Sequence, residues 1–187
     1  MRKAVLLAGV FLLGACDRNP HITEQLKTLM FEELCGNSYA GRVVSGDPQD
    51  ADWREQVLTL GPVECFGGTY TMPLAVGEDR SRVWTLIEGV EGIEFRHAHT
   101  LPDGSPDPVT GYGGYAMYPT IAGTYRNTLR FPADATTREI FLANGLEASV
   151  DNVWSLTLEP GDTLTYALAR PNRDFRAEFD LSEPIVP

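Results

Sequence analysis

Two histidines separated by one residue are the clearest candidates for chemistry in this chain. His97 and His99 lie in a segment, 93–100, in which apolar and polar residues alternate. Alternate residues of a β-strand face the same side, so both imidazoles share a face with Ile93 and Phe95. Because these two neighbours are apolar, that face is predicted to be the inner one. Two inward imidazoles, about 7 Å apart at the backbone, can bind one metal ion or contact two sides of a small ligand.

An acidic turn follows the histidines directly. The segment 103–108 reads Asp, Gly, Ser, Pro, Asp, Pro, and a carboxylate from Asp103 or Asp107 would complete a metal site with His97 and His99. In that case a divalent metal ion would be the cofactor. Two alternatives stay open: the histidines are polar contacts for a small organic ligand, or they are hydrogen-bonded residues of a strand end that bind nothing.

Two further side chains are predicted to face the same interior. The alternation places Tyr125 and Arg170 on the inward faces of their strands, where each would contact a ligand. Each also has a structural alternative, since Tyr125 would fill the core and Arg170 would hydrogen-bond carbonyl groups at the end of a barrel. The glycine-rich segment 111–115 is predicted to be a loop beside the histidine strand, either a simple turn or a lid.

No catalytic signature accompanies these residues. The sequence contains no G-x-S-x-G elbow, P-loop, H-E-x-x-H or C-x-x-C motif. No catalytic residue is therefore predicted, and binding is favoured over catalysis.

The elements that would position these side chains are β-strands. From residue 39 onward the hydrophobic pattern has a period of two, interrupted by Gly, Pro and Asp turn signals. The predicted strands are 39–45, 56–60, 68–76, 81–88, 92–100, 114–118, 123–131, 149–159, 163–170 and 174–181. Such a set closes on itself or divides into two sheets, because one open sheet would leave a long exposed edge. The predicted fold is all-β, a single antiparallel meander barrel, with a β-sandwich as the alternative.

Two helices are predicted beside the strands. The first covers 22–34, where apolar residues recur with a helical period between an N-cap at Thr23 and an end at Gly36. The second covers 134–144, begins at Asp134 and is inserted before the last strands.

The order of these elements resembles that of calycin-type barrels, the architecture of lipocalins. The resemblance rests on a leading helix, on Gly36, Tyr39 and Gly41 at the opening of the first strand, and on a sequential meander. It implies a closed antiparallel barrel. The chain departs from the pattern in two places: Tyr39 stands where tryptophan is usual, and the helix 134–144 precedes the last strands instead of following them.

The N-terminus carries an export signal. Arg2 and Lys3 precede the apolar run 4–13, which is too short to cross a bilayer of about 30 Å as a lasting helix. The run leads into Leu-Gly-Ala-Cys at 13–16, which resembles the lipobox of bacterial lipoproteins.

This resemblance implies the organisation and location of the protein. Residues 1–15 would be a cleaved signal peptide, Cys16 would become the lipidated N-terminus, 16–21 would form a short tether, and 22–187 would form a single β-rich domain. The protein is then expected in the bacterial cell envelope, anchored in a membrane on the periplasmic side. If the sorting rule of enteric bacteria applies, Asp17 implies the inner membrane.

The net charge narrows the possible partners. The full chain has a formal charge of −11, and removal of 1–15, which holds two basic and no acidic residues, brings it to −13. This acidity disfavours nucleic acid and bare anionic membranes as partners. Attachment to a membrane would therefore come from the lipid on Cys16, and the remaining predicted partner is a small ligand or another envelope protein.

The three cysteines fit this location. With Cys16 used for lipidation, Cys35 and Cys65 remain as an even pair in an oxidising compartment, which predicts a disulfide between them. Two buried thiols or a redox pair are the alternatives.

These features together predict a membrane-anchored lipoprotein whose barrel binds a small ligand or a metal ion. The alternatives are an envelope interaction module with a solid core, and a hydrolase without a recognisable motif.

Overall fold

Strands make up most of the protein. The computed structural model describes residues 31–90, 92–117 and 128–185. The strands are β1 (Tyr39–Val43), β2 (Leu58–Leu60), β3 (Glu64–Phe66), β4 (Thr69–Val76), β5 (Asp79–Glu88), β6 (Gly92–His99), β7 (Tyr112–Met117), β8 (Thr128–Pro132), β9 (Val153–Glu159), β10 (Thr163–Arg170) and β11 (Arg173–Asp180). The helices are η1 (Pro48–Asp50), α2 (Ala51–Arg54), α3 (Ala135–Ala143) and η2 (Glu147–Asp151). The predicted dominance of β-structure is confirmed.

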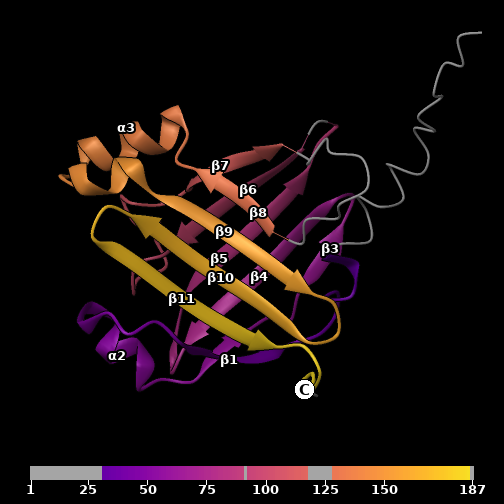
Figure 1. The fold of residues 1–187 in the computed structure, drawn as a ribbon. Coiled ribbons are helices and arrows are strands. Elements are labelled where there is room, and N and C mark those ends of the chain that lie inside the picture. The colour runs from indigo at the N-terminus through magenta and orange to yellow at the C-terminus, as the bar shows by residue number, and fades with distance from the viewer. Residues whose placement is uncertain (1–30, 91, 118–127, 186–187) are drawn as a thin grey trace, which may run out of the picture.

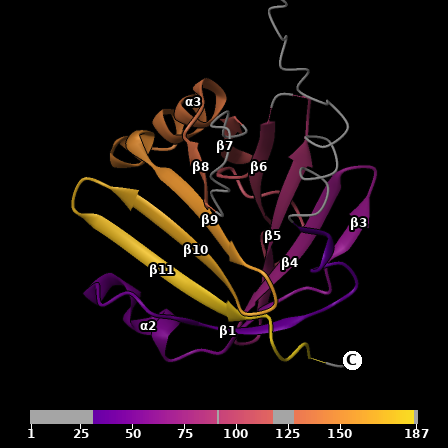
Figure 2. The same cartoon turned by 45° about the vertical axis from the view of Figure 1, so that its right-hand side comes forward.

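The strands form one continuous antiparallel sheet that curls into a barrel. Its order is β7-β6-β5-β4-β2-β1-β11-β10-β9-β8, and β3 pairs with β4 outside this path. The two halves of the sheet face each other across the interior (Figures 1 and 2). The first and last strands of the described chain, β1 and β11, are paired through Gly41 and Phe179. The antiparallel meander barrel is therefore confirmed, and the sheet does not divide into the two layers of a sandwich.

The barrel is nearly closed, with a seam between β7 and β8. Among the described residues these two strands share no ladder, and an isolated bridge joins Gly114 to Ala133. A side chain of α3 completes the seam: the Thr137 hydroxyl accepts a hydrogen bond from the Gly113 amide at 2.7 Å and donates one to the Gly113 carbonyl at 2.8 Å. Asp134 starts this helix by accepting a hydrogen bond from the Thr137 amide, as predicted.

Two glycines of β7 allow the backbones on its two sides to approach closely, Gly113 on the side of β6 and Gly114 across the seam on the side of β8. A Cβ atom on Gly113 would lie 1.8 Å from the Phe95 carbonyl oxygen, and one on Gly114 would lie 2.1 Å from the Pro132 carbonyl oxygen. The sequence prediction of a loop at 111–115 was wrong for this reason. Glycine is a poor strand former, but here it serves the close approach of neighbouring backbones.

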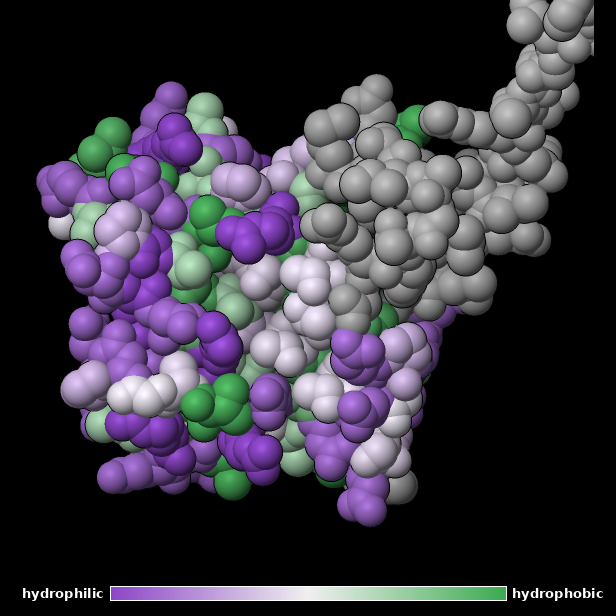
Figure 3. All heavy atoms as spheres, viewed as in Figure 1, coloured by the Kyte–Doolittle hydropathy of each residue, from purple (hydrophilic) through white to green (hydrophobic). Residues whose placement is uncertain are grey.

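The core follows the predicted alternation. Alternate residues of the strands are buried, among them Tyr70, Met72, Trp84, Leu86, Ile93, Phe95, Trp154 and Tyr166. Burial of each large apolar side chain contributes about 1.5–3 kcal/mol to folding. Hydrophilic side chains cover much of the outer face that Figure 3 shows, with hydrophobic ones scattered among them. The apolar core of the described residues therefore lies inside the barrel.

A disulfide closes one end of the barrel. Cys35 and Cys65 are bonded, as predicted, and this bond links the segment before β1 to β3. Phe31 and Leu34 are buried beside it, and the Phe31 ring lies 5.8 Å from the Tyr70 ring. This end is called the disulfide end below.

Several predictions fall outside the described residues. They are the signal peptide, Cys16, Asp17, most of the helix 22–34, and Tyr125. Phe31 and Glu32 are helical, and Gly36 has a φ of 76°, which agrees with the predicted end of that helix. None of the helices within the described ranges is long and apolar enough to cross a membrane.

Candidate ligand pocket

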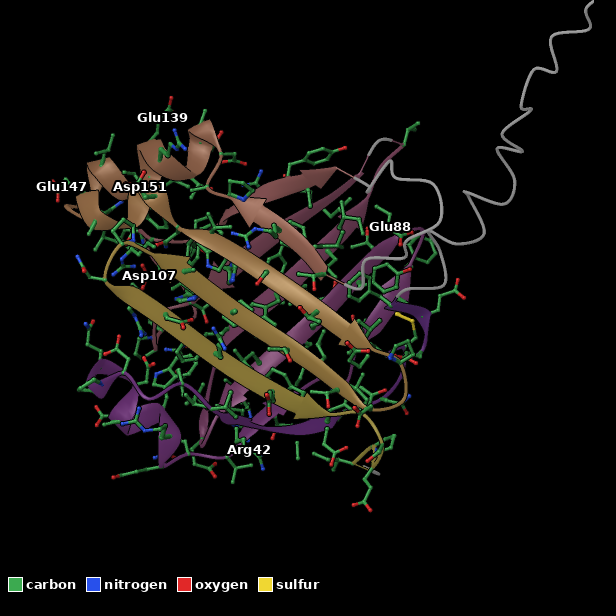
Figure 4. The ribbon with its side chains drawn as sticks, in the orientation of Figure 1. Arg42, Glu88, Asp107, Glu139, Glu147 and Asp151 are labelled. Atoms are coloured by element: carbon green, nitrogen blue, oxygen red, sulfur yellow. A yellow bond between two sulfur atoms is a disulfide. The ribbon has the colours of Figure 1, made fainter. Side chains whose placement is uncertain are left out.

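A pocket opens at the end of the barrel opposite the disulfide. Its volume is about 290 Å³, and η1 and α2 form one side of it. In Figure 4 this end is marked by Asp107 and the disulfide end by Glu88. The lining residues are Gln49, Asp50, Trp53, Leu74, Arg82, Trp84, His97, His99, Tyr112, Tyr166, Leu168, Arg173 and Phe175. Both predicted histidines are therefore brought to one cavity.

His97 forms part of the pocket floor and is held by two hydrogen bonds. It is 2% exposed. Its Nδ1 lies 3.3 Å from the Tyr112 carbonyl oxygen, which can only accept, so Nδ1 carries the proton. Nε2 then accepts from the Tyr166 hydroxyl at 3.1 Å. Burial lowers the pKa of His97 to about 3, so this imidazole is neutral at physiological pH.

His99 lies nearer the opening. Its Nε2 is 3.2 Å from the Tyr112 hydroxyl oxygen. Burial lowers the pKa of His99, and the positive charge of Arg82 acts in the same direction, whereas Asp107 and Asp79 oppose it. Burial also raises the pKa of Tyr112 to about 12, so the phenol keeps its proton. The His99 and Tyr112 pair therefore offers neutral hydrogen-bonding groups to the cavity.

One wall of the pocket is a cation–π pair. The Arg82 guanidinium carbon lies 5.0 Å from the centre of the Trp53 ring, and it forms an ion pair with Asp79. The Trp53 ring meets Phe175 edge-on at 5.6 Å. Arg82 reaches this place because it faces Leu74 and His99 across the ladders of β5, which puts it on the inward face.

Trp53 is held in position by a nearly buried ion-pair cluster. Asp47 begins η1 by accepting a hydrogen bond from the Gln49 amide, and Pro48 suits the first helical position. Arg173 of β11 forms ion pairs with Asp47 at 3.1 Å and with Asp50. These contacts fix η1, and with it α2, against the sheet.

The charge on Asp50 is stabilised by its partners. Burial alone would raise the pKa of Asp50, but hydrogen bonds from Arg173 and Ser45 outweigh this effect and leave that pKa below its usual value. The Asp50 hydrogen bond raises the pKa of Arg173 in turn. Both side chains are therefore charged, and the positive charge of Arg173 neutralises the negative charge of Asp50.

Aromatic rings form the deeper walls. Trp84 and Tyr166 are stacked at 4.4 Å between ring centres, and His97 stacks on Tyr112 at 4.7 Å. Trp154 lies 5.1 Å from the His97 ring. The interior thus offers flat apolar surfaces, while most polar groups lie at the opening.

The remaining predicted site residues have other surroundings. Asp107 lies beside His99, because its amide donates to the His99 carbonyl at 3.1 Å. Asp103 is exposed and accepts hydrogen bonds from the amide and hydroxyl of Ser105. Arg170 does not line the pocket; it donates to the Asn152 side-chain oxygen at 3.1 Å. This contact corresponds to the structural alternative for Arg170.

The described residues do not form a metal-binding arrangement. Within residues 31–90, 92–117 and 128–185, no group of three or more His, Cys, Asp or Glu side chains is placed to hold a metal ion. The Nε2 atoms of His97 and His99 each have a tyrosine partner. The metal site of His97, His99, Asp103 and Asp107 stays a sequence-based prediction, and the observed cavity has the composition of an organic ligand site.

The candidate site predicted from the sequence included His97 and His99 but missed most of the other lining residues, among them Arg82, Arg173, Trp53 and Asp50. Arg82 and Arg173 each stand two residues before an inward aromatic residue, Trp84 and Phe175, so strand alternation could have identified both. Their charge argued against an inward position, although charged side chains are acceptable at the mouth of a barrel when they are paired. Trp53 and Asp50 belong to short helices between β1 and β2, which are too short to produce a periodic signal.

Comparison of the chain with protein-family models, with curated proteins and with solved structures gave no match. The site is therefore interpreted from its own geometry.

Proposed function

We propose that this protein is a binding protein that takes up a small organic ligand at the open end of its barrel. The observation that carries this proposal is the cavity of about 290 Å³ with aromatic walls and polar groups at its opening. Ligand sites are typically concave, mostly apolar and lined by a few polar groups that fix orientation. The volume suits a ligand of roughly one or two rings, because it lies at the lower end of the range for such sites.

The polar groups suggest how a ligand would be oriented. Hydrogen bonds from Arg82 to protein atoms go through one nitrogen, Nη1, to Asp79 and Ser81. Its other donors, Nε and Nη2, have no hydrogen-bond partner among the described residues. Gln49 lines the same opening. An apolar part of the ligand would therefore enter between the rings, and a polar part would remain at Arg82, Gln49 and His99.

The lipobox at 13–16 supports the second part of the proposal, that the domain is anchored in a bacterial membrane through lipid on Cys16. Phe31, the first described residue, lies at the disulfide end. A chain coming from a membrane anchor would enter the domain there, and the pocket at the opposite end would open away from the membrane.

Native mass spectrometry of protein purified from its own envelope tests the ligand proposal. Leu168 lines the pocket, so Leu168→Trp would fill it, whereas Ala169→Trp adds the same side chain at an exposed neighbouring position. The native protein and the Ala169→Trp control are expected to retain a bound small molecule that Leu168→Trp loses. Absence of any bound mass in the native protein, or equal retention by both variants, would contradict the proposal.

Substitution of Cys16 by serine tests the anchor. The variant is expected in the soluble fraction, and a variant that stays in the membrane fraction would refute lipidation as the means of attachment.

A further inference from the structure

We infer that the pocket selects an uncharged ligand with a flat apolar ring and a hydrogen-bond acceptor, and that it discriminates against both carboxylates and amines. This inference rests on the proposed binding function and adds the chemical class of the ligand. The argument comes from how the charges around the opening are paired.

The positive charges at the opening already have carboxylate partners. Arg82 is paired with Asp79, and Arg173 is paired with Asp47 and Asp50. A carboxylate ligand would compete with these aspartates and would also be repelled by them. It would give up its hydration without gaining an uncompensated positive charge, which is unfavourable in a partly buried site.

The negative charges are equally committed. Both oxygens of Asp50 accept hydrogen bonds, one from Arg173 alone and the other from Arg173 and Ser45. Asp50 is only 2% exposed. Asp79 accepts hydrogen bonds from the Ser81 amide and from Arg82. An ammonium ligand would therefore meet the guanidinium groups of Arg82 and Arg173 in the lining without a free carboxylate to bind.

The histidines add no charge near neutral pH. Both have lowered pKa values because they are buried. Asp107, whose amide donates to the His99 carbonyl, lies outside the pocket lining. A ligand can therefore bind to the hydrogen-bond donors of Arg82, to the Gln49 amide and to the His99 and Tyr112 pair. Its apolar part can pack against the aromatic walls. These groups match a neutral molecule whose carbonyl or similar acceptor meets the guanidinium.

Three probes of the same ring size separate the possibilities. Benzamide is neutral, benzoate is negative and benzylammonium is positive at pH 7.5. Their dissociation constants are measured by ligand-observed NMR with the protein purified from its own envelope and kept in detergent micelles. Leu168→Trp serves as the blank for binding outside the pocket and for partition into micelles. The dissociation constant of benzamide is expected to be at least about tenfold lower than that of either charged probe.

A charge-switch variant sharpens the test. Asp79→Asn removes the partner of Arg82, so benzoate should bind at least about tenfold more tightly than it does to the native protein. Benzamide affinity should change little. Asp103→Asn is the matched control, because Asp103 is also an exposed aspartate that accepts a hydrogen bond from a serine amide two residues later. It should alter none of the affinities.

The outcomes distinguish this inference from the proposed function. If benzoate or benzylammonium binds the native pocket as tightly as benzamide, and Leu168→Trp abolishes that binding, the selectivity for neutral ligands is wrong while the binding function stands. If none of the probes binds, the inference is overturned. Native mass spectrometry of the purified protein then tests the proposed function separately. Unchanged benzoate affinity in Asp79→Asn would also overturn the inference.

Discussion

The two ends of the barrel are closed by different kinds of interaction. At the disulfide end, buried Phe31 and Leu34 pack beside the bond between Cys35 and Cys65. At the pocket end, the ion pairs of Arg173 and the cation–π pair of Arg82 surround an open cavity. Apolar burial and a disulfide bond involve no titratable charge, so the stability that they contribute does not depend on the protonation of side chains. Buried ion pairs contribute little net stability but fix positions and charges. One end is therefore held by apolar packing and a covalent bond, and the other, which we propose binds the ligand, by charged side chains in fixed positions.

The largest expected effect lies at the disulfide end. Replacement of both Cys35 and Cys65 by alanine removes a bond that spans 30 residues, and the free energy of unfolding should fall by about 3–4 kcal/mol in the chain-entropy model. Urea denaturation measures this change. Ligand binding at the pocket end should persist below the denaturation midpoint, and its loss in the folded variant would show that the two ends are not independent.

Acid should weaken the pocket end through His97. Its pKa of about 3 in the folded state lies below the ordinary value of 6.5, so the unfolded chain binds more protons between these two pH values. The contribution of His97 to the free energy of unfolding is therefore largest above its ordinary pKa of 6.5, and it decreases as the pH falls toward 3. The expected loss between pH 6.5 and 4 is about 3 kcal/mol.

Two glutamine variants test this acid dependence by urea denaturation across the pH range. His97→Gln should flatten the slope of unfolding free energy against pH, whereas His99→Gln, at a less buried position, should keep most of it. An unchanged slope in His97→Gln would assign the acid sensitivity to other groups.

Loss of the ion pairs at the pocket end should have a smaller effect. Arg173→Met leaves nearly buried Asp50 without its cation, and the expected cost is about 2 kcal/mol, reduced from that of a fully buried pair because Arg173 is partly exposed. Arg176→Met on the same strand removes an exposed pair with Asp174 and should cost under about 0.5 kcal/mol. Thermal and urea denaturation measure the loss of unfolding free energy in both variants. Equal losses would show that the burial of Asp50 does not increase the cost of removing its ion-pair partner.

The smallest of these effects belongs to the seam that runs between the two ends. Thr137→Val removes a fully buried hydroxyl that satisfies both polar backbone groups of Gly113. The expected loss is about 1–2 kcal/mol. Thr136→Val, at the exposed neighbouring position, is the control for helix propensity. If both variants lose the same unfolding free energy, the stability of the seam does not depend on the Thr137 hydroxyl.

The sequence predicted the fold well because local alternation carries most of that information. Strands β4, β6 and β10 lie within one residue of their predicted bounds, and the inward positions of Ile93 and Phe95 followed from period two alone. Strand β3 was missed because its three residues are all exposed, so no alternation marks them.

The candidate site was only partly predictable. His97 and His99 were found because they continue an apolar face. The ion pairs between Arg173 and Asp50 join residues 123 positions apart, and no local pattern records such a pairing. The cavity itself depends on α2, a four-residue helix that is too short for a periodic signal.

The hydroxyl of Thr137 has a consequence for solubility. An unpaired strand edge invites pairing with another chain, and the edge of β7 at Gly113 is the place where this barrel would expose one. Because Thr137 occupies both backbone hydrogen-bonding groups of Gly113, it blocks strand addition there without using a strand of its own. Together with the Asp134 amide, which also donates to the Gly113 carbonyl at 3.3 Å, Thr137 thus leaves no free backbone group at Gly113 for another chain to pair with.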